Sequence, residues 1–275
     1  MSNSYLPCPA IIEQVEPLVP EHRLFTFRPQ RPLALAPGQF VEVSLAGIGA
    51  FPVSACDLVR DGCIRSCIRR TGRVTAALFR LQAGAAIGLR GPFGNGFPLA
   101  AFAAGDALLI AGGLGLAPLR ALLHALLEDR ARSGRIILLY GAREPGAMLF
   151  RDELAGLAAA GLIELRMTVD FAEEFPCREV GVLCRVGVVP ELLDDVVFDP
   201  ARTVAAVCGP PALYRCLLEQ LAATGIPAGR IFATLERRMR CGVGACCHCV
   251  TGGVFLCQDG PVFTLDRLRT MEGAI

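Results

Sequence analysis

The sequence contains no tryptophan, and aromatic residues make up only 7% of its 275 positions. Its hydrophobic cores must therefore consist mainly of aliphatic side chains. The net charge is also small, because 27 arginines, with no lysine, nearly balance 26 aspartates and glutamates and leave a net charge of +1. That balance supplies no positive field for nucleic acid or for an anionic membrane surface. Disorder is excluded as well, since 53% of the residues are hydrophobic and disordered chains combine low hydrophobicity with high charge.

The sequence also lacks the marks of secretion and membrane insertion. Its first residues contain no basic region followed by a long apolar stretch, so we expect no signal peptide. The one stretch that resembles a membrane span, residues 98–119, carries a single charge at Asp106 but is interrupted by glycines and ends near Ala117-Pro118. This pattern is typical of a strand, a glycine turn and a helix start in series. We therefore expect no transmembrane segment.

Cysteine is abundant, with 13 residues, an odd number. Because no signal peptide is expected and the chain is too long for a small disulfide-rich domain, this number favours reduced thiols and a cytoplasmic location. Cysteines scattered through apolar segments are expected to be small buried hydrophobic residues. They are Cys8, Cys56, Cys63, Cys67, Cys177, Cys184, Cys208 and Cys216.

The first hundred residues predict a small antiparallel barrel. Short segments rich in β-branched and aromatic residues alternate with turn dipeptides, which is typical of such folds. The expected strands cover residues 11–15, 23–27, 40–45 and 63–69. A short helix is expected after Gly72, because Val74, Leu78 and Leu81 recur at helical spacing.

From residue 106 the pattern changes to alternating strands and helices, which predicts a doubly wound parallel sheet. The expected strands cover residues 107–111, 135–140, 163–169, 203–208 and 231–235, and the helices lie around residues 119–127, 149–159 and 211–223. The remaining residues fit neither pattern. The sequence therefore predicts three parts: a barrel over 1–102, an α/β domain over 103–235 and a cysteine-bearing lobe over 236–275.

The strongest motif is the spacing C-x4-C-x2-C-x7-C in the last part, formed by Cys241, Cys246, Cys249 and Cys257. Glycines between these cysteines let the loop fold tightly, and the first three have the spacing of plant-type ferredoxins. The pattern predicts a [2Fe–2S] cluster. Structural zinc, with His248 as a possible ligand, is the alternative, although zinc sites usually present two close pairs of ligands. Cys247 adjoins a ligand and is expected to be a bystander.

Two glycine-rich turns follow predicted parallel strands. The first contains Gly112, Gly113, Leu114, Gly115 and Leu116, and its bare backbone at a helix N-terminus is suited to a pyrophosphate, although it lacks the G-x-G-x-x-G fingerprint. Simple packing of a strand on a helix is the alternative. The second turn contains Cys208, Gly209 and Pro210 and lies at the edge where open α/β sheets bind ligands.

The barrel half carries three further motifs: Phe51-Pro52-Val53-Ser54, Ile68-Arg69-Arg70-Thr71-Gly72-Arg73-Val74-Thr75 and Gly91-Pro92-Phe93-Gly94. Their residues are compatible with ordinary turns and solvated arginines. Alternatively, the arginines beside Gly72 and Thr75 are suited to clamp a diphosphate.

In this order the motifs resemble those of the ferredoxin–NADP reductase superfamily over essentially the whole chain. Within it, the sequence is most similar to flavin subunits that end in a [2Fe–2S] lobe: the gamma subunits of cytoplasmic NiFe hydrogenases, the anaerobic sulfite reductase B subunit and the electron-transfer subunit of dihydroorotate dehydrogenase B. Tyr140-Gly141-Ala142-Arg143 and Glu236-Arg237-Arg238-Met239-Arg240 also match. The seven-residue gap before Cys257 is more similar to the hydrogenase group.

The resemblance implies a set of site residues. FAD would lie in the barrel, with Phe51, Pro52, Val53 and Ser54 along the isoalloxazine and Ser54 near N5. Its ribityl and pyrophosphate parts would be held by Ile68, Arg69, Arg70, Gly72, Arg73, Val74 and Thr75. NAD(P) would lie on Gly112, Gly113, Leu114, Gly115 and Leu116, with Cys208, Gly209 and Pro210 near the nicotinamide. Ser54 and Cys208 are the implied catalytic residues.

The resemblance leaves some points open. Phe51 stands where the family usually has arginine, so FMN is an alternative to FAD. Arg143 follows the second parallel strand, where selectivity for a 2′-phosphate is decided, but NAD and NADP both stay open. The implied function is to pass electrons between NAD(P)H and a partner subunit of a hetero-oligomeric complex through FAD and the cluster, with a NiFe hydrogenase as the expected partner.

Several alternatives to this function stay open. The partner could instead be a sulfite reductase or a dihydroorotate dehydrogenase B subunit, or the chain could be a free-standing NAD(P)H:ferredoxin reductase. A zinc-stabilised scaffold on a degenerate flavin fold is the non-enzyme alternative. The three histidines share no motif, and His124, beside a leucine stripe, is expected to be structural.

Overall fold

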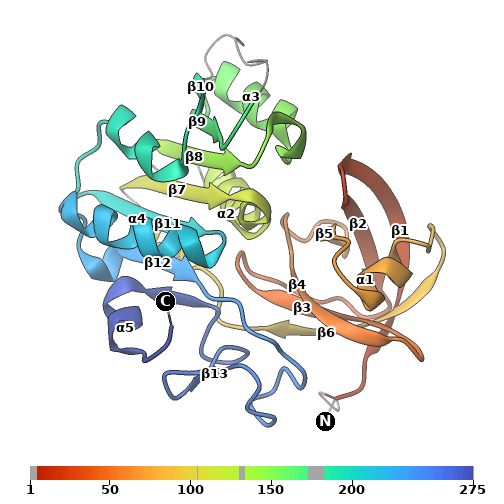
Figure 1. Ribbon diagram of the computed structural model, residues 1–275. Helices are drawn as coiled ribbons and strands as arrows, with labels where there is room; N and C mark the ends of the chain where they lie inside the picture. The colour runs from red at the N-terminus through yellow and green to blue at the C-terminus, as the bar shows by residue number, and fades with distance from the viewer. Residues whose placement is uncertain (1–4, 104, 130–133, 173–182, 275) are drawn as a thin grey trace.

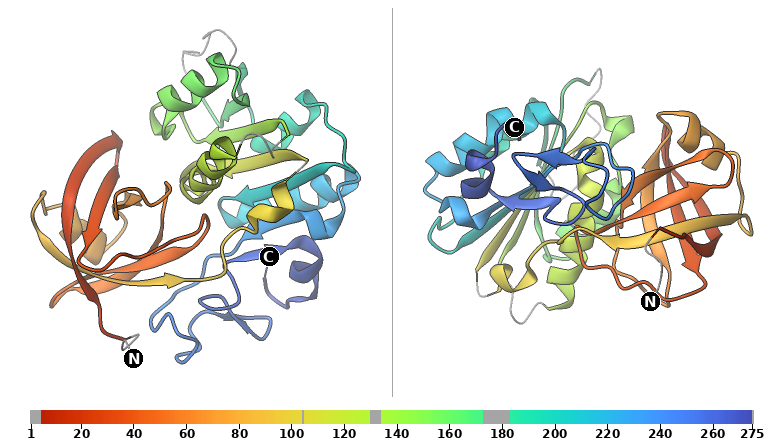
Figure 2. Two further views of the ribbon diagram at one scale, coloured as in Figure 1. Left: turned by 180° about the vertical axis from the view of Figure 1, so that it is seen from behind. Right: turned by 90° about the horizontal axis from the view of Figure 1, so that it is seen from below.

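The computed structural model describes residues 5–103, 105–129, 134–172 and 183–274. It contains a six-stranded antiparallel sheet, a seven-stranded sheet that is almost wholly parallel, and a C-terminal segment lying against both (Figures 1 and 2). The predicted fold class, a barrel followed by an α/β domain and a C-terminal lobe, is confirmed. Within the described ranges, none of the helices has the length and apolar character needed to span a bilayer.

The antiparallel sheet has the strand order β4-β3-β6-β1-β2-β5. Its strands are β1 (Cys8–Val19), β2 (His22–Pro29), β3 (Phe40–Leu45), β4 (Gly49–Ser54), β5 (Ile64–Arg69) and β6 (Ala86–Phe93), and the short helix α1 (Arg73–Leu78) follows β5. The two edge strands approach each other, because the Cys56 amide after β4 donates to the Arg65 carbonyl of β5 at 2.8 Å. Inward residues such as Ile12, Phe25 and Val43 are fully buried, so the curled sheet encloses its own core.

Strands β4 and β6 were not predicted from the sequence. β4 has Pro52 at its centre, and proline is tolerated there because β4 is an edge strand with no second neighbour. β6 contains Gly88, Gly91 and Pro92, which interrupt the alternation of polar and apolar residues. Composition therefore suggested turns where the barrel has strands.

The second sheet has the order β10-β9-β8-β7-β11-β12-β15. Its strands are β7 (Asp106–Gly112), β8 (Ile136–Ala142), β9 (Glu164–Val169), β10 (Leu183–Val186), β11 (Thr203–Cys208), β12 (Ile231–Thr234) and β15 (Val262–Thr264). Helices α2 (Leu116–Glu128) and α3 (Arg151–Ala159) pack on one face, and α4 (Pro211–Ala223), α5 (Leu265–Thr270) and the 3₁₀ helix Val189–Asp195 pack on the other. The alternating pattern of the sequence is thus realised as a doubly wound sheet.

The C-terminal segment contacts both halves. It carries the small hairpin of β13 (Val250–Thr251) and β14 (Val254–Phe255), and its strand β15 pairs antiparallel with β12 at the sheet edge. On the other side it meets the end of β6, where the Gly94 amide donates to the Cys257 carbonyl at 3.1 Å. The predicted division at residue 236 therefore separates segments that share one sheet.

The scattered cysteines divide into two groups. Six of them, Cys8, Cys56, Cys63, Cys67, Cys184 and Cys208, are buried as expected. The expectation was wrong for Cys216, which is exposed because α4 turns Leu213, Leu217 and Leu221 toward the sheet and this position away from it. Cys177 lies outside the described residues.

Candidate flavin, nucleotide and cluster sites

A cavity of about 400 Å³ lies where the barrel meets the α/β sheet. Its walls come from β4, the end of β5, the turn after β7, the ends of β11 and β12, and the start of the C-terminal segment. The structure thus brings together residues that are far apart in the sequence. The predicted site residues that line it are Phe51, Pro52, Val53, Ser54, Ile68, Arg69, Thr75, Leu114 and Cys208.

The loop between β5 and α1 is fixed by its own threonine. The Thr75 hydroxyl oxygen accepts hydrogen bonds from the amides of Thr71 and Gly72 at 3.0 and 3.1 Å, and its hydroxyl donates to the Gly72 carbonyl. This arrangement holds the start of α1 against the cavity, which Thr71 and Thr75 both line. It is a rigid platform beside the cavity.

Other predicted residues of this motif lie outside the cavity lining. Arg70 forms an ion pair with Glu21 at 2.6 Å, and the Arg73 guanidinium donates to the Ile48 carbonyl at 2.7 Å. Gly72 and Val74 are likewise not part of the lining. Of the three arginines in the motif, Arg69 alone is placed in the wall.

The two glycine turns of the α/β sheet pack against each other. A Cβ atom on Gly115 would lie 2.2 Å from the Cys208 carbonyl oxygen, and one on Gly112 would lie 3.0 Å from Pro210. These glycines are therefore required for close packing of the turns. Gly113 has φ +53° and faces open space, so it is the glycine at which a ligand can approach the backbone. Leu116 is buried at the start of α2.

Cys208 is buried at the end of β11 in a small hydrogen-bonded group. Its sulfur accepts from the Thr234 hydroxyl at 2.9 Å, and the Tyr214 hydroxyl donates to the Thr234 carbonyl at 2.6 Å. Burial raises the pKa of the Cys208 thiol to about 12. The thiol is consequently neutral near pH 7, and it lies in the cavity wall.

The sequence reasoning missed several wall residues. Thr234, Glu236, Arg237 and Met239 line the cavity after the last parallel strand. Glu236 is exposed and faces the cavity. Their position at the carboxyl edge of the sheet was the available signal. Arg143 lies elsewhere, with its guanidinium carbon 6.0 Å from the Phe171 ring centroid.

The cysteine loop supplies amide hydrogens to its own sulfurs. The Cys241 sulfur accepts from the amides of Ala245 and Cys246 at 3.3 Å each, and the Cys257 sulfur accepts from the Gly244 amide at 3.2 Å. Amide donors stabilise thiolate charge and are among the features that tune iron–sulfur centres. The loop therefore directs backbone amides at two of its four sulfurs.

The four thiols are arranged as two pairs. The Cys246 thiol contacts Cys241, and the Cys257 thiol contacts Cys249. Across the described ranges, no three histidine, cysteine or acidic side chains converge as ligands of a single metal ion. This grouping is compatible with two irons, each held by one pair of thiolates.

The neighbours of the four cysteines take no part in this arrangement. The His248 Nδ1 atom lies 3.0 Å from the Cys246 carbonyl oxygen, so that ring nitrogen is engaged in a hydrogen bond. Cys247 is exposed and has φ +58°, and its expected role as a bystander stays a prediction.

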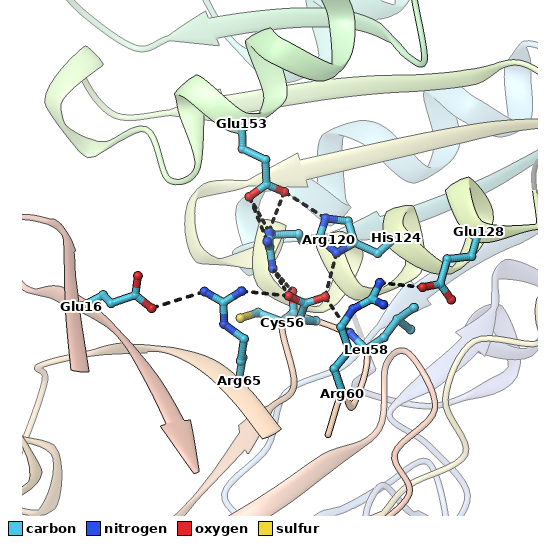
Figure 3. Close-up of polar contacts among 10 residues, drawn as sticks. Glu16, Cys56, Leu58, Arg60, Arg65, Arg120, His124, Glu128 and Glu153 are labelled. Atoms are coloured by element: carbon cyan, nitrogen blue, oxygen red, sulfur yellow. Dashed lines mark hydrogen bonds and ion pairs between the residues drawn. The ribbon is translucent and has the colours of Figure 1, made fainter. Parts of the chain in front are cut away.

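An ion-pair network joins the barrel to α2 and α3 (Figure 3). The carboxylate of Asp57, which follows β4, forms ion pairs with Arg65 at 3.1 Å, Arg120 at 3.3 Å and His124 at 2.7 Å. Glu153 of α3 accepts from Arg120 at 2.8 Å and contacts His124 at 2.9 Å. His124 is thus structural, as expected, and its partners come from both halves of the chain.

The fold and the two sites together define a nucleotide-dependent oxidoreductase that carries an iron–sulfur domain. Residues 109–219 match the oxidoreductase NAD-binding domain family, and residues 236–269 match the iron–sulfur cluster binding domain of dihydroorotate dehydrogenase B. These matches confirm the predicted nucleotide and iron–sulfur parts.

Full-length relatives narrow the family further. The chain is 39% identical to the sulfhydrogenase 2 gamma subunit of Pyrococcus furiosus over 98% of both chains. It is 33% identical to a probable dihydroorotate dehydrogenase B electron-transfer subunit of Pyrococcus horikoshii, over 90% of this chain and 86% of that protein. The chain therefore belongs to the family of sulfhydrogenase gamma subunits and dihydroorotate dehydrogenase B electron-transfer subunits, as its motifs indicated.

Solved structures share the fold. A chain of an NADH-dependent reduced ferredoxin-NADP oxidoreductase superposes with a TM-score of 0.74 at 23% identity, covering 97% of this chain and 90% of that one. A ferredoxin NADP+ reductase from Neisseria gonorrhoeae, solved with FAD and NADP, gives 0.67 at 21% identity, covering 79% and 91%. These likenesses show that the chain shares its fold with these reductases.

Proposed function

We propose that this chain is the electron-transfer subunit of a hetero-oligomeric oxidoreductase complex and carries electrons between NAD(P)H and a partner redox subunit. The observation that supports this most directly is the shared cavity, whose walls combine the barrel, the nucleotide turn and the residues leading into the cysteine loop. A bound flavin exchanges electron pairs with a nicotinamide and single electrons with an iron–sulfur centre. Each of the three parts of the chain, 1–102, 103–235 and 236–275, then serves one of these groups.

We assign FAD to the cavity, with Phe51 to Ser54 beside its ring system. Arg69 and the platform of Thr75 are suited to its phosphates. Ser54 and the neutral Cys208 shape the wall from the two halves of the chain, which is what hydride transfer needs, because it depends on positioning rather than on a dedicated acid or base. Gly113 is the proposed point of approach for the dinucleotide.

We assign a [2Fe–2S] cluster to Cys241, Cys246, Cys249 and Cys257. The backbone amides that donate to the Cys241 and Cys257 sulfurs are of the kind that tunes such centres. The free state of every described cysteine supports a cytoplasmic location, where thiols stay reduced.

As the partner we propose a NiFe hydrogenase subunit. Two relatives named sulfhydrogenase gamma subunits are 39% and 37% identical over at least 95% of this chain. The second candidate is a dihydroorotate dehydrogenase catalytic subunit, favoured by the description of the matching iron–sulfur family. Co-purification of a redox subunit at a fixed ratio would support a complex, and its catalytic assay would identify which one. Isolation of the chain alone, with full ferredoxin reduction activity, would favour a free-standing reductase instead.

The proposal is tested by anaerobic purification, iron analysis and separation of the released flavin. We expect FAD and about two irons per chain, with both chromophores bleached by NADH or by NADPH. FMN in place of FAD would show that Phe51 changes how the flavin is held. Protein that binds neither flavin nor iron after reconstitution would contradict the proposed function, and stoichiometric zinc would favour the scaffold alternative.

A further inference from the structure

Arg90 of the barrel strand β6 forms hydrogen bonds with the main chain at the first cysteine of the cluster loop. The Arg90 Nη1 atom donates to the Cys241 carbonyl at 2.9 Å, and its Nη2 atom donates to the Arg240 carbonyl at 3.1 Å. These contacts join residues about 150 positions apart in the chain. One guanidinium therefore fixes two consecutive peptide units where the loop enters the proposed cluster site.

The guanidinium is itself held rigidly from the opposite side. Its Nε and Nη2 atoms donate to one Glu42 oxygen of β3 at 2.8 and 2.7 Å. The two side chains are only 7% and 11% exposed, so the pair is internally neutralised and protected from solvent. Arginine suits this task because its planar fork serves several acceptors in one fixed geometry.

An aromatic contact continues the packing between β6 and the cluster loop toward the cavity where flavin is proposed. A Cβ atom on Gly242, the residue after the first cysteine, would lie 2.7 Å from the Phe93 ring, so the loop backbone rests directly on that ring. Phe93 in turn packs against Phe40, with ring centroids 5.7 Å apart, and Phe40 lines the cavity. Packed side chains thus connect the cavity to the cluster loop without a gap.

The far end of the loop is fixed to the same part of the barrel. The Gly94 amide donates to the Cys257 carbonyl at 3.1 Å, and the Asn95 side chain donates to the carbonyls of Asp259 and Val262 at 3.0 and 2.8 Å. β6 and the turn after it therefore hold both the first and the last cysteine of the motif.

We propose that Arg90 is a positioning residue, which together with Glu42 and Phe93 seats the cluster loop on the barrel and sets its separation from the flavin cavity. The identity of the two redox groups rests on the function proposed above. The step concerned is the passage of one electron between these groups, and Arg90 takes no part in bond making or proton transfer. Its effect is to keep the acceptor loop in place.

The test uses the full-length protein and the double variant Glu42→Gln/Arg90→Met. This variant removes the hydrogen bonds from Arg90 to the cluster loop without leaving a buried charge unpaired. The matched control is Glu13→Gln/Arg28→Met, the same exchange at an exposed barrel pair. In the double variant we expect flavin content and the rate of flavin bleaching by NAD(P)H to match the control. Release of iron to a chelator should be about tenfold faster, as for other outer partners of metal ligands, and freeze-quench EPR should show slower reduction of the cluster.

Two further measurements separate positioning from charge. In the apo protein, hydrogen exchange over residues 240–246 should be faster in the double variant than in the control, which reports the loop without any cofactor. Arg90→Gln alone leaves Glu42 unneutralised and should also lower the cluster potential, because a negative charge disfavours reduction. Arg90→Lys keeps the charge but lacks the fork, and should show the faster iron release without that potential shift.

Control-like iron release, loop exchange and cluster reduction in the double variant would overturn the inference. If the double variant does not fold, control-like behaviour of Arg90→Lys would overturn it instead. A wild-type protein that cannot bind flavin or iron would contradict the proposed function, whereas a loaded wild type with unaffected variants would contradict this inference alone.

Discussion

The His124 Nδ1 atom lies 2.7 Å from the Asp57 Oδ1 atom, and this contact joins α2 to the barrel loop after β4 (Figure 3). The other ring nitrogen lies 2.9 Å from a Glu153 oxygen. Only the protonated imidazolium can donate to both carboxylates at once. The contact between the two halves of the chain is therefore coupled to the charge of one histidine.

This coupling predicts a pH dependence of stability. Burial lowers the pKa of His124, but the hydrogen bonds to Asp57 and Glu153 outweigh it and the nearby Arg120, and they raise the pKa above its usual value. A raised folded-state pKa gives stability that is complete below the unfolded value of about 6.5 and is lost as the pH rises through the folded value.

His124→Gln should therefore destabilise the protein by about 1–2 kcal/mol at pH 6, and by less at pH 9. Urea unfolding of both proteins at several pH values measures this difference. A difference that stays constant, or grows with pH, would show that the histidine is uncharged in the folded protein.

Removal of Arg120 should have a larger effect. Its side chain is only 5% exposed and neutralises both Asp57 and Glu153. Arg120→Met leaves these carboxylates short of a partner, so we expect a loss of about 3–5 kcal/mol. The control Arg60→Met breaks the exposed pair with Glu128 in the same region and should cost less than about 1 kcal/mol. Equal urea midpoints for the two variants would contradict the network's role in holding the halves together.

Two glycines in the turn after β7 are expected to differ in role: one is needed for close packing and the other for the approach of a ligand. Gly115→Ala places a methyl group 2.2 Å from the Cys208 carbonyl oxygen, backbone that cannot easily move, so we expect a marked drop in melting temperature. Gly113→Ala meets open space and carries only the strain of φ +53°, a cost of about 1 kcal/mol. Its main effect should be weaker NAD(P)H binding in a titration. Comparable stability losses with unchanged nucleotide affinity would remove Gly113 from the site.

The sequence could predict features whose signal is local. The cysteine spacing lies within 17 residues, from Cys241 to Cys257, and the helices of the α/β half show regular leucine periodicity. The Asp57 network could not be predicted, because apart from the Arg65–Asp57 pair its partners lie 29 to 67 residues apart and each one alone resembles a solvated surface charge. The same holds for Arg90, whose contacts with the cysteine loop arise only when β6 and the C-terminal segment meet. Strand β4 was hidden by its central proline.

The paired arrangement of the thiols gives a final prediction about the metal. Cys249→Ser removes one member of the Cys249–Cys257 pair, and Cys247→Ser changes an exposed neighbour. If four thiolates hold a two-iron cluster, the first variant should lose most of its iron and the visible absorption of the cluster, while the second should keep both. Metal analysis after anaerobic reconstitution measures this contrast. Iron loss in Cys247→Ser, or zinc retained equally by both variants, would show that the ligand set assigned from the spacing is wrong.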